Sequence, residues 1–227
     1  MPFLFHRTNA ASTAEGKPIN SPEISIQSTP TQPSPRIGVL AIQGDYAAHA
    51  AALTEAGADP ILVRTAQALG DLDGLIIPGG ESTTMLRFLE RGGLLESLKG
   101  FAETKPIFGT CAGCILLAQE VLHPSQTSLG VFDATVERNA YGRQIDSAII
   151  SQETSLPGGP LEMVYIRAPR ITRVGKEVEV LAERDGLPVL TRQGKLMAAT
   201  FHPELSSDRR VHRLFVDLVR QSKNVEK

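Results

Sequence analysis

The hydrophobic residues fall into two patterns that alternate along the first half of the chain. Short continuous apolar runs, typical of strands covered on both faces, occur at 37–42, 61–63, 75–77 and 107–108. Apolar residues at helical spacing predict helices at 45–56, 82–91, 94–103 and 111–121. Buried strands that alternate with helices are typical of a mainly parallel sheet.

The second half of the chain has a different pattern. Strand-like runs, separated by glycine-rich turns and no helical pattern, occur at 132–137, 163–166, 178–182, 188–191 and 196–201. They predict antiparallel pairing at one edge of the sheet. A last helix is expected over 208–221, with one apolar face that covers the sheet. The predicted fold class is therefore α/β: a three-layer, mainly parallel sheet with helices on both faces and an antiparallel edge.

The N-terminal segment differs from the rest in composition. Up to Pro35 it is rich in Ser, Thr, Pro and Asn, and its prolines interrupt any helix or strand. We expect a disordered leader at 1–35, one folded domain at 36–223 and a disordered tail at 224–227. The apolar stretch near the N-terminus is too short for a secretory signal, and an organelle transit peptide is the weaker alternative.

Composition and charge narrow the class of protein. Of 227 residues, 23 are basic and 25 acidic, so the net charge of -2 lacks the basic excess of a nucleic-acid-binding protein. No apolar run approaches the roughly 18 residues of a membrane span. The two cysteines, Cys111 and Cys114, are too few for a disulfide framework or a structural zinc site. We therefore expect a cytoplasmic protein with no metal and no nucleic-acid or membrane partner.

The segment Gly109-Thr110-Cys111-Ala112-Gly113 joins a predicted strand directly to a predicted helix. Small residues on both sides of a nucleophile permit a strained turn that exposes it. Backbone N–H groups at the start of the helix favour a thiolate at Cys111. The backbone N–H of Ala112 is suited to stabilise an oxyanion. The alternative is that Cys111 is a small buried hydrophobic residue, as Cys114 in its apolar run is expected to be.

A nucleophilic thiol needs a base, and the base needs a group that orients it. His202 ends the apolar run of a predicted strand, and Glu204 follows two residues later. A carboxylate at that spacing is suited to hold the imidazole and to stabilise it when protonated. A surface turn is the alternative. His49 lies within the first helix, and His212, among polar neighbours on the last helix, is predicted to be a solvated surface residue.

The segment Pro78-Gly79-Gly80-Glu81-Ser82 follows another buried strand. Paired glycines let the backbone approach a ligand closely, at the edge where ligands bind in open α/β sheets. The alternative is an ordinary turn with Ser82 as the N-cap of the next helix. Neither G-x-G-x-x-G nor a P-loop is present, which disfavours a phosphate-binding loop.

The cysteine elbow, the later His-x-Glu and the Pro-Gly-Gly loop together resemble the class I (triad) glutamine amidotransferases over about residues 36–220. Finer features resemble one branch of that family, the glutaminase subunits of pyridoxal 5'-phosphate (PLP) synthase. These features are Leu40-Ala41-Ile42-Gln43-Gly44-Asp45, Glu81-Ser82-Thr83-Thr84-Met85, Val136-Glu137-Arg138-Asn139, Tyr141-Gly142-Arg143-Gln144, Tyr165-Ile166-Arg167-Ala168-Pro169 and Phe201-His202-Pro203-Glu204-Leu205.

The resemblance implies hydrolysis of L-glutamine to L-glutamate and ammonia, with the ammonia passed to a PLP synthase subunit in a hetero-oligomer. It implies Cys111 as the nucleophile, His202 as the proton carrier and Glu204 as the residue that orients His202. The substrate-binding residues that it implies are Gly80, Glu81, Ser82, Arg138, Ile166 and Arg167. Backbone N–H groups at Gly79, Gly80 and Ala112 are expected to form the oxyanion hole. The resemblance implies no cofactor.

Three other functions stay open at this point. A non-catalytic binding protein with the same fold predicts no turnover with or without a partner. A cysteine hydrolase or peptidase predicts turnover of peptides and not of glutamine. A glutaminase that serves another pathway predicts a different partner.

Overall fold

The structure, a computed structural model, describes residues 33–138 and 147–225. Most of the predicted leader at 1–35 lies outside these residues, as do the segments 139–146 and 226–227. The last helix reaches Val225, inside the predicted tail at 224–227. Within the described part of the chain, each helix is too short or too polar to span a bilayer.

Seven strands form the central sheet in the order β10-β11-β12-β4-β3-β1-β2. Their bounds are β1 (Arg36–Leu40), β2 (Asp59–Val63), β3 (Gly74–Ile77), β4 (Ile107–Thr110), β10 (Glu179–Arg184), β11 (Leu187–Gln193) and β12 (Leu196–Ala199). The pairs from β12 to β2 are parallel, whereas β10 and β11 pair antiparallel at one edge. The predicted class of sheet is confirmed.

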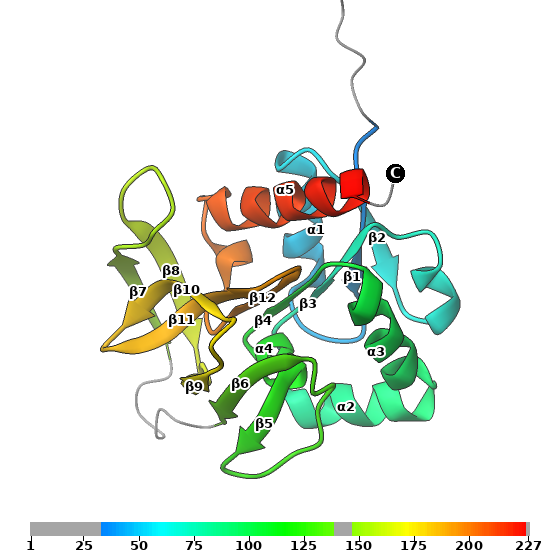
Figure 1. Ribbon diagram of the computed structural model, residues 1–227, viewed down its shortest axis with the longest axis horizontal. Coiled ribbons are helices and arrows are strands. Elements are labelled where there is room, and N and C mark those ends of the chain that lie inside the picture. The colour runs from blue at the N-terminus through cyan, green and yellow to red at the C-terminus, as the bar shows by residue number, and fades with distance from the viewer. Residues whose placement is uncertain (1–32, 139–146, 226–227) are drawn as a thin grey trace, which may run out of the picture. The chain divides into compact units, whose positions relative to one another are not determined.

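Helices cover both faces of this sheet (Figure 1). On one face lie α1 (Tyr46–Glu55) and α5 (Arg210–Val225), and on the other lie α2 (Ser82–Arg91), α3 (Leu94–Thr104) and α4 (Ala112–Leu117). Alternate strand residues enter the two cores: Ile76 and Phe108 pack in the core of α1 and α5, and Ile77 and Ile107 in the other. Burial on both faces explains why these strands are continuous apolar runs.

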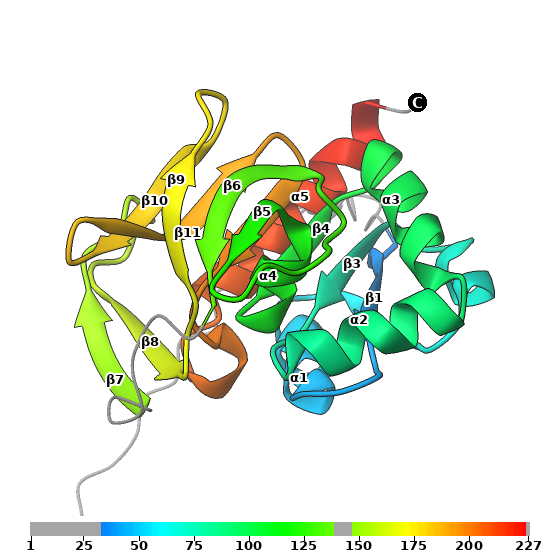
Figure 2. The same cartoon turned by 90° about the horizontal axis from the view of Figure 1, so that it is seen from below.

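Two smaller sheets flank the central one (Figure 2). The first contains β5 (Ala118–Leu122), β6 (Phe132–Glu137) and β9 (Arg170–Val174), and the second pairs β7 (Ser147–Gln152) with β8 (Leu161–Ile166). Strands β6 and β8 were expected at the edge of a single sheet, and this expectation was wrong. Strands β7 and β9 were not predicted. Two 3-10 turns complete the described chain, η1 (Ala66–Leu69) and η2 (Pro203–Leu205).

The predicted helix over 111–121 is too long. Helix α4 ends at Leu117, and the next five residues form β5, which pairs with β6 in parallel. Every residue from Ala112 to Ala118 is buried, and a continuous buried run fits a helix and a strand equally well. The pairing partner, which is distant in sequence, determines where the helix ends.

The prediction for His212 was also wrong, because its side chain is fully buried. On α5, Phe215 follows His212 by three residues and Val216 follows it by four, and both are buried as well. Helix α5 packs against α1, and His212 lies on the packed face.

Candidate active site

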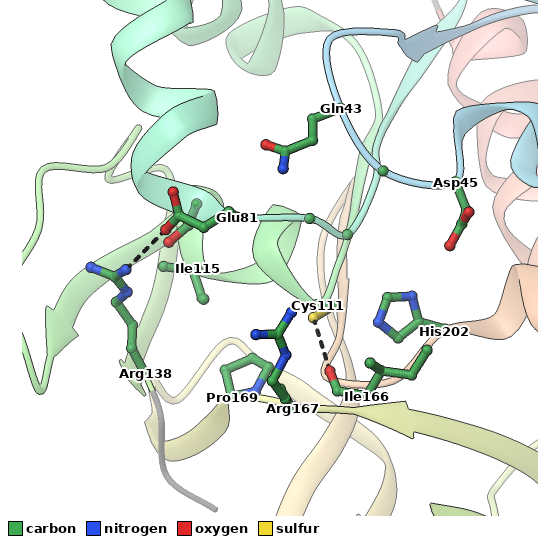
Figure 3. A pocket seen from close by; sticks show the side chains of 14 residues that line it. Gln43, Asp45, Glu81, Cys111, Ile115, Arg138, Ile166, Arg167, Pro169 and His202 are labelled. Atoms are coloured by element: carbon green, nitrogen blue, oxygen red, sulfur yellow. Dashed lines mark hydrogen bonds and ion pairs between the residues drawn. The ribbon is translucent and has the colours of Figure 1, made fainter. Parts of the chain in front are cut away.

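The candidate site lies where four parallel strands of the central sheet end. Cys111 follows β4, the Gly79-Gly80 pair follows β3, His202 follows β12 and Asp45 lies beyond β1. Loops from these strands surround a cavity of about 300 Å³ (Figure 3). The residues that line it are Gln43, Gly44, Asp45, Gly79, Gly80, Glu81, Ser82, Cys111, Ile115, Arg138, Ile166, Arg167, Pro169 and His202. Ligands bind at this edge in open α/β sheets.

Cys111 occupies a strained turn between β4 and α4. Its φ is 48° and its ψ is -104°, a conformation that a non-glycine residue seldom adopts. The turn closes tightly, since a Cβ atom at Gly109 would lie 2.5 Å from the Gly113 carbonyl oxygen. A Cβ atom at Gly113 would collide with the carbonyl of Ile77 on β3. Both glycines of the elbow are therefore needed for the turn to pack against the sheet.

His202 and Glu204 form a buried pair. The ring nitrogen Nδ1 of His202 lies 2.8 Å from Oε1 of Glu204, and since a carboxylate only accepts, Nδ1 donates. The backbone N–H of His202 donates to the carbonyl oxygen of Val164, which ties the residue to β8. The single turn η2 brings Glu204 back beneath the imidazole.

The surroundings of His202 favour its protonated form. Burial acts to lower its pKa, but the adjacent Cys111 sulfur and the hydrogen bond to Glu204 raise the pKa to about 10. The second ring nitrogen, Nε2, makes no hydrogen bond with a described residue, so the sulfur acts by proximity rather than through an aligned bond. An imidazolium next to a sulfur stabilises a thiolate.

The Gly79-Gly80 loop lies directly against Cys111 and His202. A Cβ atom at Gly79 would collide with Cε1 of His202 and would lie 3.3 Å from Cβ of Cys111. Gly80 has a φ of 142°, which residues with a side chain rarely adopt. The structure therefore brings Gly79 and Gly80 to the cavity, as predicted. Ala112 is buried and follows Cys111, and it does not itself line the cavity.

Glu81 is the N-cap of α2, a role that had been considered for Ser82. Its carboxylate accepts hydrogen bonds from the backbone N–H of Thr83 at 3.0 Å and of Thr84 at 2.7 Å. Burial opposes ionisation, but hydrogen bonds from Thr84 and Thr83 hold the pKa of Glu81 at about 2. Ser82 instead donates from Oγ to Gln126.

The remaining predicted substrate residues also reach the cavity. Arg138 donates to Oγ1 of Thr83 at 2.9 Å and pairs with Glu81 at 3.4 Å. The carbonyl oxygen of Ile166 lies 4.0 Å from the Cys111 sulfur. Arg167 has a φ of 44°, and it lines the cavity together with Cys111 (Figure 3). The predicted segments at Asn139 and 141–144 lie outside the described residues.

Sequence reasoning gave no role to several groups around the site. Asp45 is the most notable, because its carboxylate and donor atoms of His202 and Glu204 all lie within 4.8 Å of one another. Within this group Nδ1 of His202 is already hydrogen-bonded to Oε1 of Glu204. The arrangement is suited to an imidazolium flanked by two carboxylates. The position of Asp45 beyond the end of β1 is the sequence signal that identifies it.

The second cysteine has no place in the cavity. Cys114 is buried on α4, and burial raises the pKa of its thiol well above the ordinary range. Its predicted place in the core is confirmed. Both cysteines are free thiols.

Comparison with known proteins agrees with this geometry. The chain is 58% identical over 192 residues to "Pyridoxal 5'-phosphate synthase subunit PdxT" of Koribacter versatilis, covering 85% of this chain and 100% of the relative. It is 52% identical to the subunit of the same name from Solibacter usitatus, covering 80% and 97% of the two chains. A crystal structure described as a glutamine amidotransferase matches with a TM-score of 0.77 and 45% identity, covering 81% of this chain and 98% of that one. The model of the SNO glutamine amidotransferase family matches residues 39–221. This chain belongs to the SNO glutamine amidotransferase family.

Proposed function

We propose that this chain is the glutaminase subunit of a pyridoxal 5'-phosphate synthase, which hydrolyses L-glutamine and supplies the ammonia to a synthase subunit. One observation carries the catalytic part: the strained Cys111 after β4 and His202 after β12, which is hydrogen-bonded to the buried Glu204, line the same cavity. The description of the matching family supports glutamine as the substrate, and the names of the relatives support a PLP synthase partner.

The hydrolysis follows from the residues around the cavity. The Cys111 thiolate attacks the side-chain amide carbon of glutamine, and the oxyanion that forms is stabilised by backbone N–H groups at Gly80 and Ala112. His202 gives its proton to the leaving nitrogen, so ammonia departs and a thioester remains on Cys111. His202 then takes a proton from water, which hydrolyses the thioester to glutamate. Glu204 holds the imidazole and balances its charge in each step.

The amino-acid end of glutamine needs two charged partners. The guanidinium groups of Arg138 and Arg167 at the cavity are suited to its carboxylate. Glu81, whose side chain stays 51% exposed although it caps α2, is suited to its ammonium group. The mechanism needs Cys111 as a free thiol, which a reducing cytoplasm maintains.

The test is release of glutamate from L-glutamine by the purified chain, alone and with a matching PLP synthase subunit. We expect release that increases when the synthase subunit is added and that is lost in Cys111→Ala. Folded protein that releases no glutamate in either condition would overturn the proposal and favour a binding protein on the same fold.

A further inference from the structure

A second buried polar cluster lies behind the proposed triad and has no part in the mechanism above. It consists of His49 on α1, His212 on α5 and Thr110 at the end of β4, all fully buried. Nδ1 of His49 lies 3.1 Å from Nε2 of His212. Nε2 of His49 lies 3.1 Å from Oγ1 of Thr110 and 3.2 Å from Oε2 of Glu204. The cluster therefore ends on the carboxylate that holds His202.

The contact with Glu204 determines which nitrogen of His49 carries the proton. A carboxylate only accepts hydrogen bonds, so a bare Nε2 at 3.2 Å would place two lone pairs against each other. Nε2 must carry the proton, and Nδ1 must then accept from Nε2 of His212. This leaves Nδ1 of His212 bare, in agreement with its lack of a hydrogen-bond partner among the described residues.

Glu204 needs this donor. Its Oε1 is bonded to His202, whereas its buried Oε2 has no aligned hydrogen bond with a described residue. A buried carboxylate oxygen without a donor is costly. Nε2 of His49 lies 3.1 Å from the hydroxyl oxygen of Thr110, its aligned partner, and 3.2 Å from this oxygen, and a carboxylate is the stronger acceptor of the two.

We infer that His49 is a positioning residue for the proposed hydrolysis: its Nε2–H holds Oε2 of Glu204, so that Oε1 stays directed at His202. The inference rests on the proposed function, which it extends from three residues to four. His212 supports it by fixing the tautomer of His49.

The charge state of His49 suits this role. Burial, followed by the neighbouring His212 and His202, lowers the pKa of His49 well below its ordinary value, so the ring is neutral and has one proton to donate. The charged and titratable groups near the cluster are His202, Asp45 and Cys111, together with the Glu55–Arg209 ion pair beside His212. Glu162, which accepts a hydrogen bond from Ser206, is a further one.

The direct test is the tautomer of His49 in the full-length protein, read from side-chain ¹⁵N chemical shifts of histidine-labelled samples at neutral pH. We expect a neutral ring with the proton on Nε2. A proton on Nδ1, or a charged ring, would overturn the inference whether or not the protein is active.

The second test uses two substitutions of His49. His49→Leu removes the donor at similar volume, and His49→Gln keeps an N–H near the position of Nε2. With the synthase subunit present, we expect kcat of His49→Leu to fall about 10- to 100-fold, the usual effect of losing a group that orients a catalytic residue, with KM changed less than about twofold. In His49→Gln most of kcat should return. The NMR titration of His202 should move to lower pH in His49→Leu than in the unchanged protein, because a misplaced carboxylate stabilises the imidazolium less.

Leu53→Ala is the matched control, since Leu53 is equally buried on α1 and belongs to its apolar core. We expect it to lower Tm and to leave kcat and the His202 titration unchanged. Unchanged kcat and His202 titration in a folded His49→Leu would overturn the inference alone. A wild-type chain that releases no glutamate would overturn the proposed function, while the tautomer would still test the contact.

Discussion

Gly79 has no room for a side chain, and the reason is catalytic as well as steric. A methyl group there would press on the ring of His202 and on Cys111, the two groups that face each other in the proposed attack. A displacement of about 1 Å in a catalytic group can reduce the rate about 100-fold. Because Gly79 does not have a positive φ, the effect of a substitution comes from the collision and not from backbone strain.

We predict that Gly79→Ala lowers glutaminase activity at least about 100-fold while the protein still folds. Gly100→Ala is the matched control, because Gly100 is exposed within α3 and a Cβ atom there would meet nothing within 4 Å. It should keep full activity and gain about 0.5–1 kcal/mol of stability from helix propensity. Glutamate release and thermal melting measure both effects, and near-normal activity of Gly79→Ala would contradict the packing described here.

At the residue scale, local sequence predicted the elbow but not the buried histidines. Cys111 is flanked by glycines, and the steric reason for both is local to the turn and the strand beside it. His212 was misjudged because three arginines, Arg209, Arg210 and Arg213, stand close to it in the sequence. Its helical neighbours Phe215 and Val216 are apolar, and this spacing is the signal that indicates burial. The same spacing on α1 relates His49 to Ala52 and Leu53.

At the scale of elements, the contact between α1 and α5 buries two neutral imidazoles. Burial, followed by the charge of Arg209, lowers the pKa of His212 to about 3, and the pKa of His49 is lowered as well. The unfolded chain binds a proton at each histidine below about pH 6.5, whereas the folded chain does not. This part of the stability is therefore complete above pH 6.5 and is lost as the pH falls toward 3.

We predict that Tm falls between pH 6.5 and 4.5, with up to about 1.4 kcal/mol of stability lost per pH unit for each histidine. The shift at Glu81 acts below its ordinary value of 4.5 and does not enter this range. His212→Leu should make the decrease shallower, whereas Val216→Ala, at another buried position of α5, should lower Tm equally at each pH. Calorimetry between pH 6.5 and 4.5 measures how steeply Tm falls with pH. An equally steep fall in His212→Leu would refute the assignment of this pH dependence to the buried His212.

Element prediction succeeded where packing on both faces of the sheet gives a clear pattern. Strands β1, β3 and β4 and helices α2 and α3 lie at their predicted places for this reason. The chain beyond Leu117 was misread because Val121 follows Leu117 at helical spacing, and only the pairing of β5 with β6 distinguishes strand from helix. In β7, Ile149 is exposed and Ile150 is only partly buried, which leaves a weak pattern.

At the scale of the whole molecule, the site depends on a pairing that one sequence cannot reveal. Strand β12 lies beside β4, with Ala199 opposite Thr110, although these two residues are 89 positions apart in the chain. The N–H of Cys111 donates to the carbonyl of Ala199, and His202 follows three residues later. Sequence motifs named the members of the proposed triad, whereas the sheet topology brings them to one edge.

The measurement that tests the central claim most directly is the site of covalent labelling by 6-diazo-5-oxo-L-norleucine, a glutamine analogue that alkylates a nucleophile placed at the amide carbon. The complex with the synthase subunit is labelled and mapped by peptide mass spectrometry, with and without excess L-glutamine. We predict one label, on Cys111, that glutamine suppresses, with the buried Cys114 unlabelled as the internal control. A label on Cys114 or elsewhere, or a label on Cys111 that glutamine does not suppress, would contradict the account.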